Sequence, residues 1–228
     1  MRLIKINSWL IPCFLLLNAC QGKKVNNCEK FNHFLRTQKD VNKNANIKKI
    51  VAEVLKNDTT CIEALLLRAD ILVNENQINL AKRDYSSVSR LSYSNVYALY
   101  KLGLLCIMQD DYKSAFMYFD KALNLKNKNG VFVDNLNHID KASINYDVET
   151  IELVYQLAVC SYYLGKLKTA LNYFNLCISQ NYDLSQAYLY RGAVKLESGN
   201  KSEGCDDLFH AQQLGNANAS EYILKYCK

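Results

Sequence analysis

The segment that decides the fold covers residues 96–129, VYALYKLGLLCIMQDDYKSAFMYFDKALNLKNKN, because its order of small and large residues returns in other parts of the chain. Its eighth and twentieth residues are small, Gly103 and Ala115, and its twenty-fourth is the aromatic Phe119. Residues 151–184 place small and aromatic residues at the same three positions. A pattern that returns at a fixed spacing indicates a chain built from copies of one small unit.

The unit is thirty-four residues long, and we place four copies at 62–95, 96–129, 151–184 and 185–218. Small residues at the eighth and twentieth positions allow two helices to approach closely, and a large residue at the twenty-fourth fills the space beside them. In the four copies these positions hold Ala69, Ala81 and Tyr85; Gly103, Ala115 and Phe119; Ala158, Ala170 and Phe174; and Gly192, Gly204 and Leu208. Each copy therefore predicts two antiparallel helices.

A tight turn is expected near the fifteenth residue of each copy. Glycine, asparagine and aspartate adopt the left-handed backbone conformation of such turns more readily than other residues do. The four residues found there are Asn76, Asp110, Gly165 and Gly199.

With this spacing of small and large residues, the chain resembles the tetratricopeptide-repeat (TPR) family. The resemblance implies an all-α fold, a superhelical solenoid in which each antiparallel helix pair packs on the next. Residues 62–129 would hold the first two repeats. Residues 151–228 would hold repeats three and four and a C-terminal capping helix, Ala219 to Cys227, that covers the end of the solenoid.

Two regions do not follow the period. Residues 29–61 predict a degenerate N-terminal helical pair, over 31–38 and 47–56, because apolar residues of the second segment form one stripe. Residues 130–150 form an insertion between repeats two and three. Insertions in repeat arrays lie on one face, often the face that binds a partner. Two interpretations stay open: the insertion takes part in binding, or it is a packed connector that covers the helices.

Residues 1–19 have the layout of a secretory signal peptide. Arg2 and Lys5 precede a short apolar run, and the small residue Ala19 ends the segment. The run is about half of the roughly 20 apolar residues that a membrane-spanning helix needs. The sequence therefore predicts export and not a spanning segment.

The end of this segment, Leu17-Asn18-Ala19-Cys20, resembles the lipobox of bacterial lipoproteins. The resemblance implies that the signal is removed and that Cys20 carries acyl chains, since more than one chain gives stable membrane anchoring. The polar residues 20–28 are then a tether, and Gln21 is similar to an outer-membrane sorting residue. We expect the protein in the bacterial cell envelope, anchored by lipid to the outer membrane and facing the periplasm.

The sequence contains none of the residue spacings that carry common chemistry. The histidines His33, His138 and His210 are far apart, no C-x-x-C pair occurs, and no glycine-rich phosphate loop or nucleophile elbow is present. The formal net charge of +6 comes from dispersed lysines, without a basic stripe for nucleic acid. We therefore predict no catalytic activity, cofactor, metal, nucleic-acid partner or small-molecule substrate.

The cysteines after Cys20 suggest one disulfide. Cys205 and Cys227 lie in helices expected to be antiparallel neighbours, and an exported protein meets an oxidising compartment. We predict that they are bonded, the alternative being two free thiols. Whether Cys28 and Cys61, about one repeat apart, also meet stays open. Three further cysteines fall on the packing surface of the repeats and are expected as buried thiols: Cys106, Cys160 and Cys177.

By resemblance to the family, six positions in the first helix of each repeat line a concave groove: the second, fifth, sixth, ninth, twelfth and thirteenth. The candidate binding residues are Tyr97, Tyr100, Lys101, Leu104, Tyr155, Gln156, Val159, Tyr162, Tyr163, Gln186 and Tyr190. Tyrosine combines a large apolar surface with a polar tip and is enriched at protein interfaces.

Two functions fit these observations. The first is a non-enzymatic, lipid-anchored adaptor that binds a protein or peptide partner in the tyrosine-rich groove. The second is a structural or self-associating envelope protein whose groove is plugged by its own insertion, residues 130–150.

Overall fold

The computed structural model describes residues 27–37, 46–129 and 146–228, and every regular element in these ranges is a helix. In chain order the helices are α2 (Asn27–Thr37), α3 (Ile47–Asn57), α4 (Ile62–Asn74), α5 (Ile78–Leu91), α6 (Val96–Ile107), α7 (Tyr112–Asn129), α8 (Thr150–Tyr163), α9 (Leu167–Ser179), α10 (Leu184–Glu197), α11 (Lys201–Gln213) and α12 (Ala219–Tyr226). The expected signal peptide, most of the expected tether and residues 130–145 of the expected insertion lie outside the described residues.

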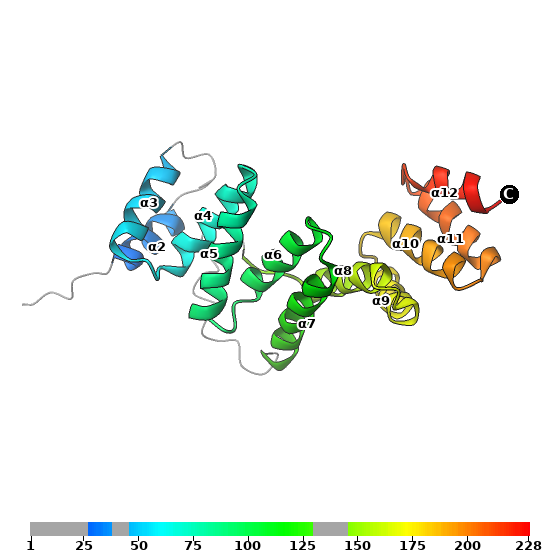
Figure 1. Ribbon diagram of the computed structural model, residues 1–228, viewed down its shortest axis with the longest axis horizontal. Coiled ribbons are helices and arrows are strands. Elements are labelled where there is room, and N and C mark those ends of the chain that lie inside the picture. The colour runs from blue at the N-terminus through cyan, green and yellow to red at the C-terminus, as the bar shows by residue number, and fades with distance from the viewer. Residues whose placement is uncertain (1–26, 38–45, 130–145) are drawn as a thin grey trace, which may run out of the picture.

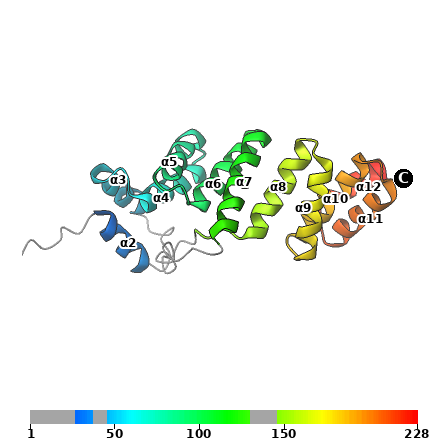
Figure 2. The same cartoon turned by 90° about the horizontal axis from the view of Figure 1, so that it is seen from below.

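The helices form an elongated row of antiparallel pairs that runs from α2 and α3 at one end to α12 at the other (Figures 1 and 2). Each of the four expected repeats contains one pair: α4 with α5, α6 with α7, α8 with α9, and α10 with α11. No described helix is both long enough and apolar enough to cross a membrane.

All four expected turns have the predicted backbone conformation. The φ angles are 59° at Asn76, 56° at Asp110, 68° at Gly165 and 85° at Gly199. At each turn the next residue donates its backbone N–H to the carbonyl five residues before it, as Gln77 does to Leu72 over 2.8 Å. This bond closes the end of the first helix and fixes where the second begins.

Small residues let the paired helices touch. A Cβ atom added to Gly103 would lie 2.5 Å from a ring carbon of Phe119, and one added to Gly192 would lie 2.9 Å from the carbonyl oxygen of Gly204. Phe119 and Phe174 are fully buried in successive core clusters. The predicted packing of a small residue against a large one is therefore present in the structure.

The first and last repeats each contain an ion pair between their two helices, in which the aspartate is buried. Arg68 on α4 donates two hydrogen bonds to Asp84 on α5, at 2.7 and 2.8 Å, and Arg191 on α10 does the same to Asp207 on α11. These are the seventh and twenty-third positions of the repeat. At the same two positions, the second repeat has Leu102 and Tyr118, and the third repeat has Leu157 and Tyr173.

A disulfide lies at each end of the row. Cys205 on α11 is bonded to Cys227 after α12, with 5.6 Å between their Cα atoms, and this is the pair expected from the sequence. Cys28 on α2 is bonded to Cys61 at the start of α4, with a Cα–Cα distance of 5.4 Å, which answers the question left open. The three remaining described cysteines are free and buried, as predicted.

The N-terminal helices correct one expected boundary. Helix α2 begins at Asn27, so the tether expected over 20–28 overlaps the first turn of a helix, and Cys28 is held in the disulfide. In α3 the predicted apolar stripe is buried. At the other end, α12 packs against Leu189 and Leu208 of the last repeat, where a capping helix was expected.

Candidate binding surface

We call the six positions expected to line the groove, taken over the four repeats, the inner face. It comprises residues of α4, α6, α8 and α10, the first helices of the repeats. The predicted binding residues on it are mostly half-buried; Tyr163 is 50% exposed. The structure corrects the prediction for Val159, which was expected to contact a partner. Val159 is 7% exposed and packs in a core cluster with Ala187 of α10, so it is not open to a partner.

The N-terminal half of the inner face is its part on α4 and α6, and the C-terminal half is its part on α8 and α10. In the N-terminal half, the carboxylate of Asp70 on α4 is contacted by three side chains. Tyr97 donates its hydroxyl to both oxygens, at 3.0 and 2.9 Å, and Tyr85 donates to Oδ1 at 2.5 Å. The ammonium of Lys101 lies 3.1 Å from the same oxygen. Burial, followed by the charge of Asp70, raises the pKa of Tyr85 and Tyr97 well above the usual value. Sequence reasoning missed this network, although the ninth repeat position of Asp70 marked it as facing inward.

The end of the insertion packs onto the same half. The ring of Tyr146 lies 4.8 Å from that of Tyr97, edge to face, and its hydroxyl is buried without a hydrogen-bond partner in the part of the chain that is described. Burial raises the pKa of Tyr146. Val148 is buried, and Lys126 on α7 donates to its carbonyl oxygen. The insertion therefore covers part of the inner face.

The covering extends to the first repeat. Leu66 and Leu67 occupy the fifth and sixth inner-face positions of α4, yet both are fully buried. They share one core cluster with Phe31 and Leu35 of α2, and Tyr146 packs against that cluster. The fifth and sixth positions of the first repeat are thus closed by the protein itself, whereas Met108, at the thirteenth position of the second repeat, is 60% exposed.

One hydrogen bond joins the two halves. Tyr100 on α6 donates its hydroxyl to Oε1 of Glu152 on α8 over 2.5 Å, and its ring lies 5.9 Å from that of Phe119. Burial, followed by this hydrogen bond, raises the pKa of Tyr100. The Tyr100 side chain therefore connects neighbouring repeats, with its hydroxyl bonded to Glu152 and its ring packed near Phe119.

The C-terminal half brings four tyrosines together, which we call the tyrosine cluster: Tyr112, Tyr162, Tyr163 and Tyr190. The rings of Tyr112 and Tyr163 are stacked at 4.2 Å, and the other ring centroids are 5.2 to 6.5 Å apart. Tyr162 and Tyr163 come from the end of α8, Tyr190 from α10 and Tyr112 from the start of α7. Three of the four were predicted; Tyr112 was missed because it lies on a second helix.

Two carboxylates border the tyrosine cluster. Tyr162 donates its hydroxyl to Oε1 of Glu197 over 2.7 Å, and Tyr112 donates to Oδ1 of Asp110 over 3.2 Å. Burial, then the neighbouring Tyr163, raises the pKa of Tyr112 to about 12. The cluster is therefore a surface of ring faces and hydroxyls with negative charge at its edges.

The other predicted residues are distributed more loosely. Tyr155 packs into the core, with its ring 6.3 Å from Phe174 and 5.7 Å from Tyr182. Leu104 packs against the core cluster around Phe119. Gln156 and Gln186 are half-buried on α8 and α10.

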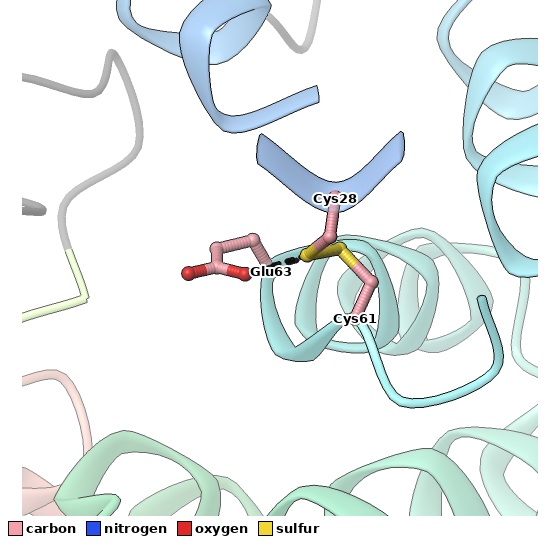
Figure 3. A group of neighbouring side chains, drawn as sticks. All are labelled: Cys28, Cys61 and Glu63. Atoms are coloured by element: carbon pink, nitrogen blue, oxygen red, sulfur yellow. Dashed lines mark hydrogen bonds between the residues drawn. A yellow bond between two sulfur atoms is a disulfide. The ribbon is translucent and has the colours of Figure 1, made fainter. Parts of the chain in front are cut away.

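One group of possible metal ligands occurs in the described ranges: Cys28, Cys61 and Glu63, whose ligand atoms lie within 4.8 Å of one another (Figure 3). The two sulfurs are bonded to each other, so they offer no thiolate, and thiolates are what a metal would bind. In this oxidised form the group is a disulfide beside a carboxylate, and it is not suited to hold a metal.

Comparisons with known proteins agree with the repeat pattern. The family described as tetratricopeptide repeat matches residues 96–129. The structure of PilF from Pseudomonas aeruginosa is similar at a TM-score of 0.63, with 13% identity over 89% of this chain and 83% of that one. MamA from Desulfovibrio magneticus RS-1 is similar at 0.62, with 11% identity over 84% of this chain and 97% of that one. PilW, described as a widely conserved type IV pilus biogenesis factor, is similar at 0.54, with 18% identity over 89% and 92%.

These findings define the class of protein: an all-α TPR solenoid, a fold that serves as a scaffold for protein interactions. The family match covers a single repeat, and the identities are low, so the likeness concerns the fold. No curated protein sequence matches the chain.

Proposed function

We propose that the protein is a lipid-anchored, non-enzymatic interaction scaffold of the bacterial cell envelope, which binds a protein partner on the C-terminal half of its inner face. The observation that carries the proposal is the tyrosine cluster. Tyr163 is half exposed and lies within contact of Tyr162 and Tyr190, whereas the tyrosines elsewhere on the inner face, Tyr97, Tyr100 and Tyr155, are half-buried. Rigid tyrosines that are only partly covered are typical of protein interfaces.

The anchor and the compartment are supported by two kinds of observation. The first is the signal-like segment ending at Cys20. The second is the pair of disulfides, Cys28–Cys61 and Cys205–Cys227, because such bonds persist in oxidising compartments and are rare in the cytosol. An outer-membrane position facing the periplasm rests on Gln21 alone.

The experiment is affinity capture of the lipidated protein from gently cross-linked cells, followed by mass spectrometry. We expect an envelope protein that is captured by the wild type and lost with the double variant Tyr162→Ala, Tyr163→Ala. Tyr93→Ala is the matched control, since Tyr93 is 77% exposed and lies outside the inner face. Capture that survives the double variant contradicts the binding surface. Capture that survives Cys20→Ser contradicts the need for the anchor.

A second candidate function is favoured by Tyr146. Its ring covers Tyr97, which fits a structural or self-associating protein that fills its own inner face. The variant Tyr146→Ala separates the two: a structural plug predicts a loosened fold and exposed apolar surface, measured by dye binding. An adaptor predicts a fold that stays closed around Asp70 and unchanged partner capture.

A further inference from the structure

We propose that the partner offers a segment with lysine or arginine side chains to the tyrosine cluster, with its cations on the tyrosine rings and between Asp110 and Glu197. This inference rests on the proposed function, because it names the chemistry of the partner that the same surface would bind.

The first argument is the sign of charge on the inner face. Its positions in the four repeats carry four carboxylates, Glu63, Asp70, Glu152 and Glu197, and one ammonium, Lys101. The chain as a whole has the opposite balance, with 28 lysines and arginines against 22 acidic residues. Lys101 is already paired with Asp70 at 3.1 Å. The inner face is therefore acidic on a basic protein, which favours a partner of positive charge.

The second argument is that three neighbouring cations already have partners within the protein. Arg191 and Lys195, on the same helix as Tyr190, contact Asp207 on α11 at 2.7 and 2.9 Å. Lys166, which follows the turn after α8, lies 4.6 Å over the ring of Phe116. Among the described residues, Asp110 accepts a hydrogen bond from the hydroxyl of Tyr112, and Glu197 accepts one from the hydroxyl of Tyr162. A tyrosine hydroxyl occupies part of a carboxylate's accepting capacity and leaves its charge in place.

The third argument is the combination of rings and carboxylates. A cation over a tyrosine ring is attracted by the negative face of the ring, and a carboxylate at the ring's edge adds charge-assisted hydrogen bonds. The same protein uses this contact elsewhere, with the guanidinium of Arg191 5.2 Å over the ring of Tyr188. Tyr163 is half exposed, and its ring contacts both Tyr112 and Tyr162, the two tyrosines that donate to these carboxylates. A guanidinium or ammonium on an extended segment fits this arrangement better than an acidic or purely apolar side chain does.

The test uses the purified full-length protein with both disulfides intact. Three fluorescent twelve-residue peptides serve as probes. The peptides share a backbone of alanine, glycine and serine and carry four arginines, four lysines or four glutamates. Fluorescence anisotropy is expected to show binding of the arginine and lysine peptides, weaker binding at higher salt, and no binding of the glutamate peptide. Equal binding of all three peptides, or no binding of any at low ionic strength, overturns the proposal.

Charge-removing variants locate the contact. Asp110→Asn and Glu197→Gln keep the side-chain shape, and asparagine tolerates the left-handed backbone at residue 110. Each variant is expected to lower the affinity for the arginine peptide by about tenfold. Glu53→Gln removes the same charge from the exposed surface of α3 and is expected to leave binding unchanged. An equal loss in all three variants means that only net charge matters, which overturns the site.

The two proposals fail in different ways. If cells yield a partner that is lost with the tyrosine variants while the peptides show no preference for positive charge, the scaffold function stands and the basic segment is wrong. If neither partner capture nor peptide binding changes when the tyrosines of the cluster are replaced, both proposals are wrong. Light scattering that shows a dimer broken by Tyr163→Ala assigns the surface to a second copy of this chain and overturns the basic segment.

Discussion

The two halves of the inner face both place tyrosines beside carboxylates, at different repeat positions and with different results. In the N-terminal half, Asp70 holds two tyrosines and a lysine, and Tyr146 covers Tyr97. In the C-terminal half, Glu197 holds one hydroxyl, and Tyr163 is half exposed. A tyrosine beside a carboxylate is thus part of the packing where the chain surrounds it, and it is the binding element that we propose where the chain leaves it open.

The largest effect is expected from the disulfides that fix the outer end of each half. Replacing Cys28 and Cys61 by serine, or Cys205 and Cys227, should lower the free energy of unfolding by about 2–4 kcal/mol, because each bond restricts the unfolded chain. Urea unfolding measures the effect, and non-reducing peptide mapping of the wild type checks both bonds. Hydrogen exchange should rise in α2 and α3 for the first pair and in α12 for the second. Free thiols in the wild-type map contradict the bonds.

Asp70→Ala should be the next most costly change, lowering the free energy of unfolding by about 2–3 kcal/mol, since it leaves two buried hydroxyls and an ammonium without their acceptor. The matched change in the other half is Glu197→Ala, for which we expect about 0.5 kcal/mol or less. Both are measured by urea unfolding of the disulfide-bonded protein. Equal effects would remove the distinction between the halves.

Tyrosine ionisation distinguishes the halves by pH. The pKa of Tyr112 is about 12, above its ordinary value of about 10, so the folded state keeps a proton that the unfolded state loses. The stability this gives is complete below about pH 10 and is lost as pH rises through about 12. Tyr85 and Tyr97 have still higher pKa values and should ionise only when the chain unfolds. Ultraviolet difference spectra of Tyr112→Phe and Tyr97→Phe check this: only Tyr112→Phe should remove ionisation that precedes unfolding.

The smallest effect is a gain. Tyr146→Phe removes a buried hydroxyl that has no described partner, so it should leave stability unchanged or raise it by about 0.5–1 kcal/mol. Tyr97→Phe, which removes a hydroxyl bonded to Asp70, should instead lower stability by about 1 kcal/mol. Thermal unfolding of both variants gives the comparison. A loss of stability in Tyr146→Phe would mean that its hydroxyl has a partner.

The helix pairs and their turns could be predicted from the sequence because each depends on local requirements. Gly103 must be small for Phe119 to pack on it, and Asp110 must tolerate a left-handed backbone; both needs recur at a fixed spacing. The candidate surface was predicted less fully. Tyr162, Tyr163 and Tyr190 meet as expected, whereas Val159 is buried in a core cluster that includes Ala187 of the next repeat.

What the sequence did not predict depends on segments without a period. The contact of Tyr146 with Tyr97 follows from the path of the insertion, and the bond from Cys28 to Cys61 follows from how α2 sits against α4. No repeat position specifies either. Tyr112 was missed for a different reason: it starts a second helix and reaches the inner face only because the turn at Asp110 places it beside Tyr163.

The ion pairs of the end repeats bear on how the chain finds its pairing. If α5 were paired with α6 or α8 in place of α4, the buried Asp84 would face a leucine, Leu102 or Leu157, instead of an arginine. Leaving a buried charge unpaired is costly, so such misassembled arrangements are penalised while the apolar middle repeats alone would tolerate them. Arg68 with Asp84, and Arg191 with Asp207, thus favour a partner helix from an end repeat over one from a middle repeat.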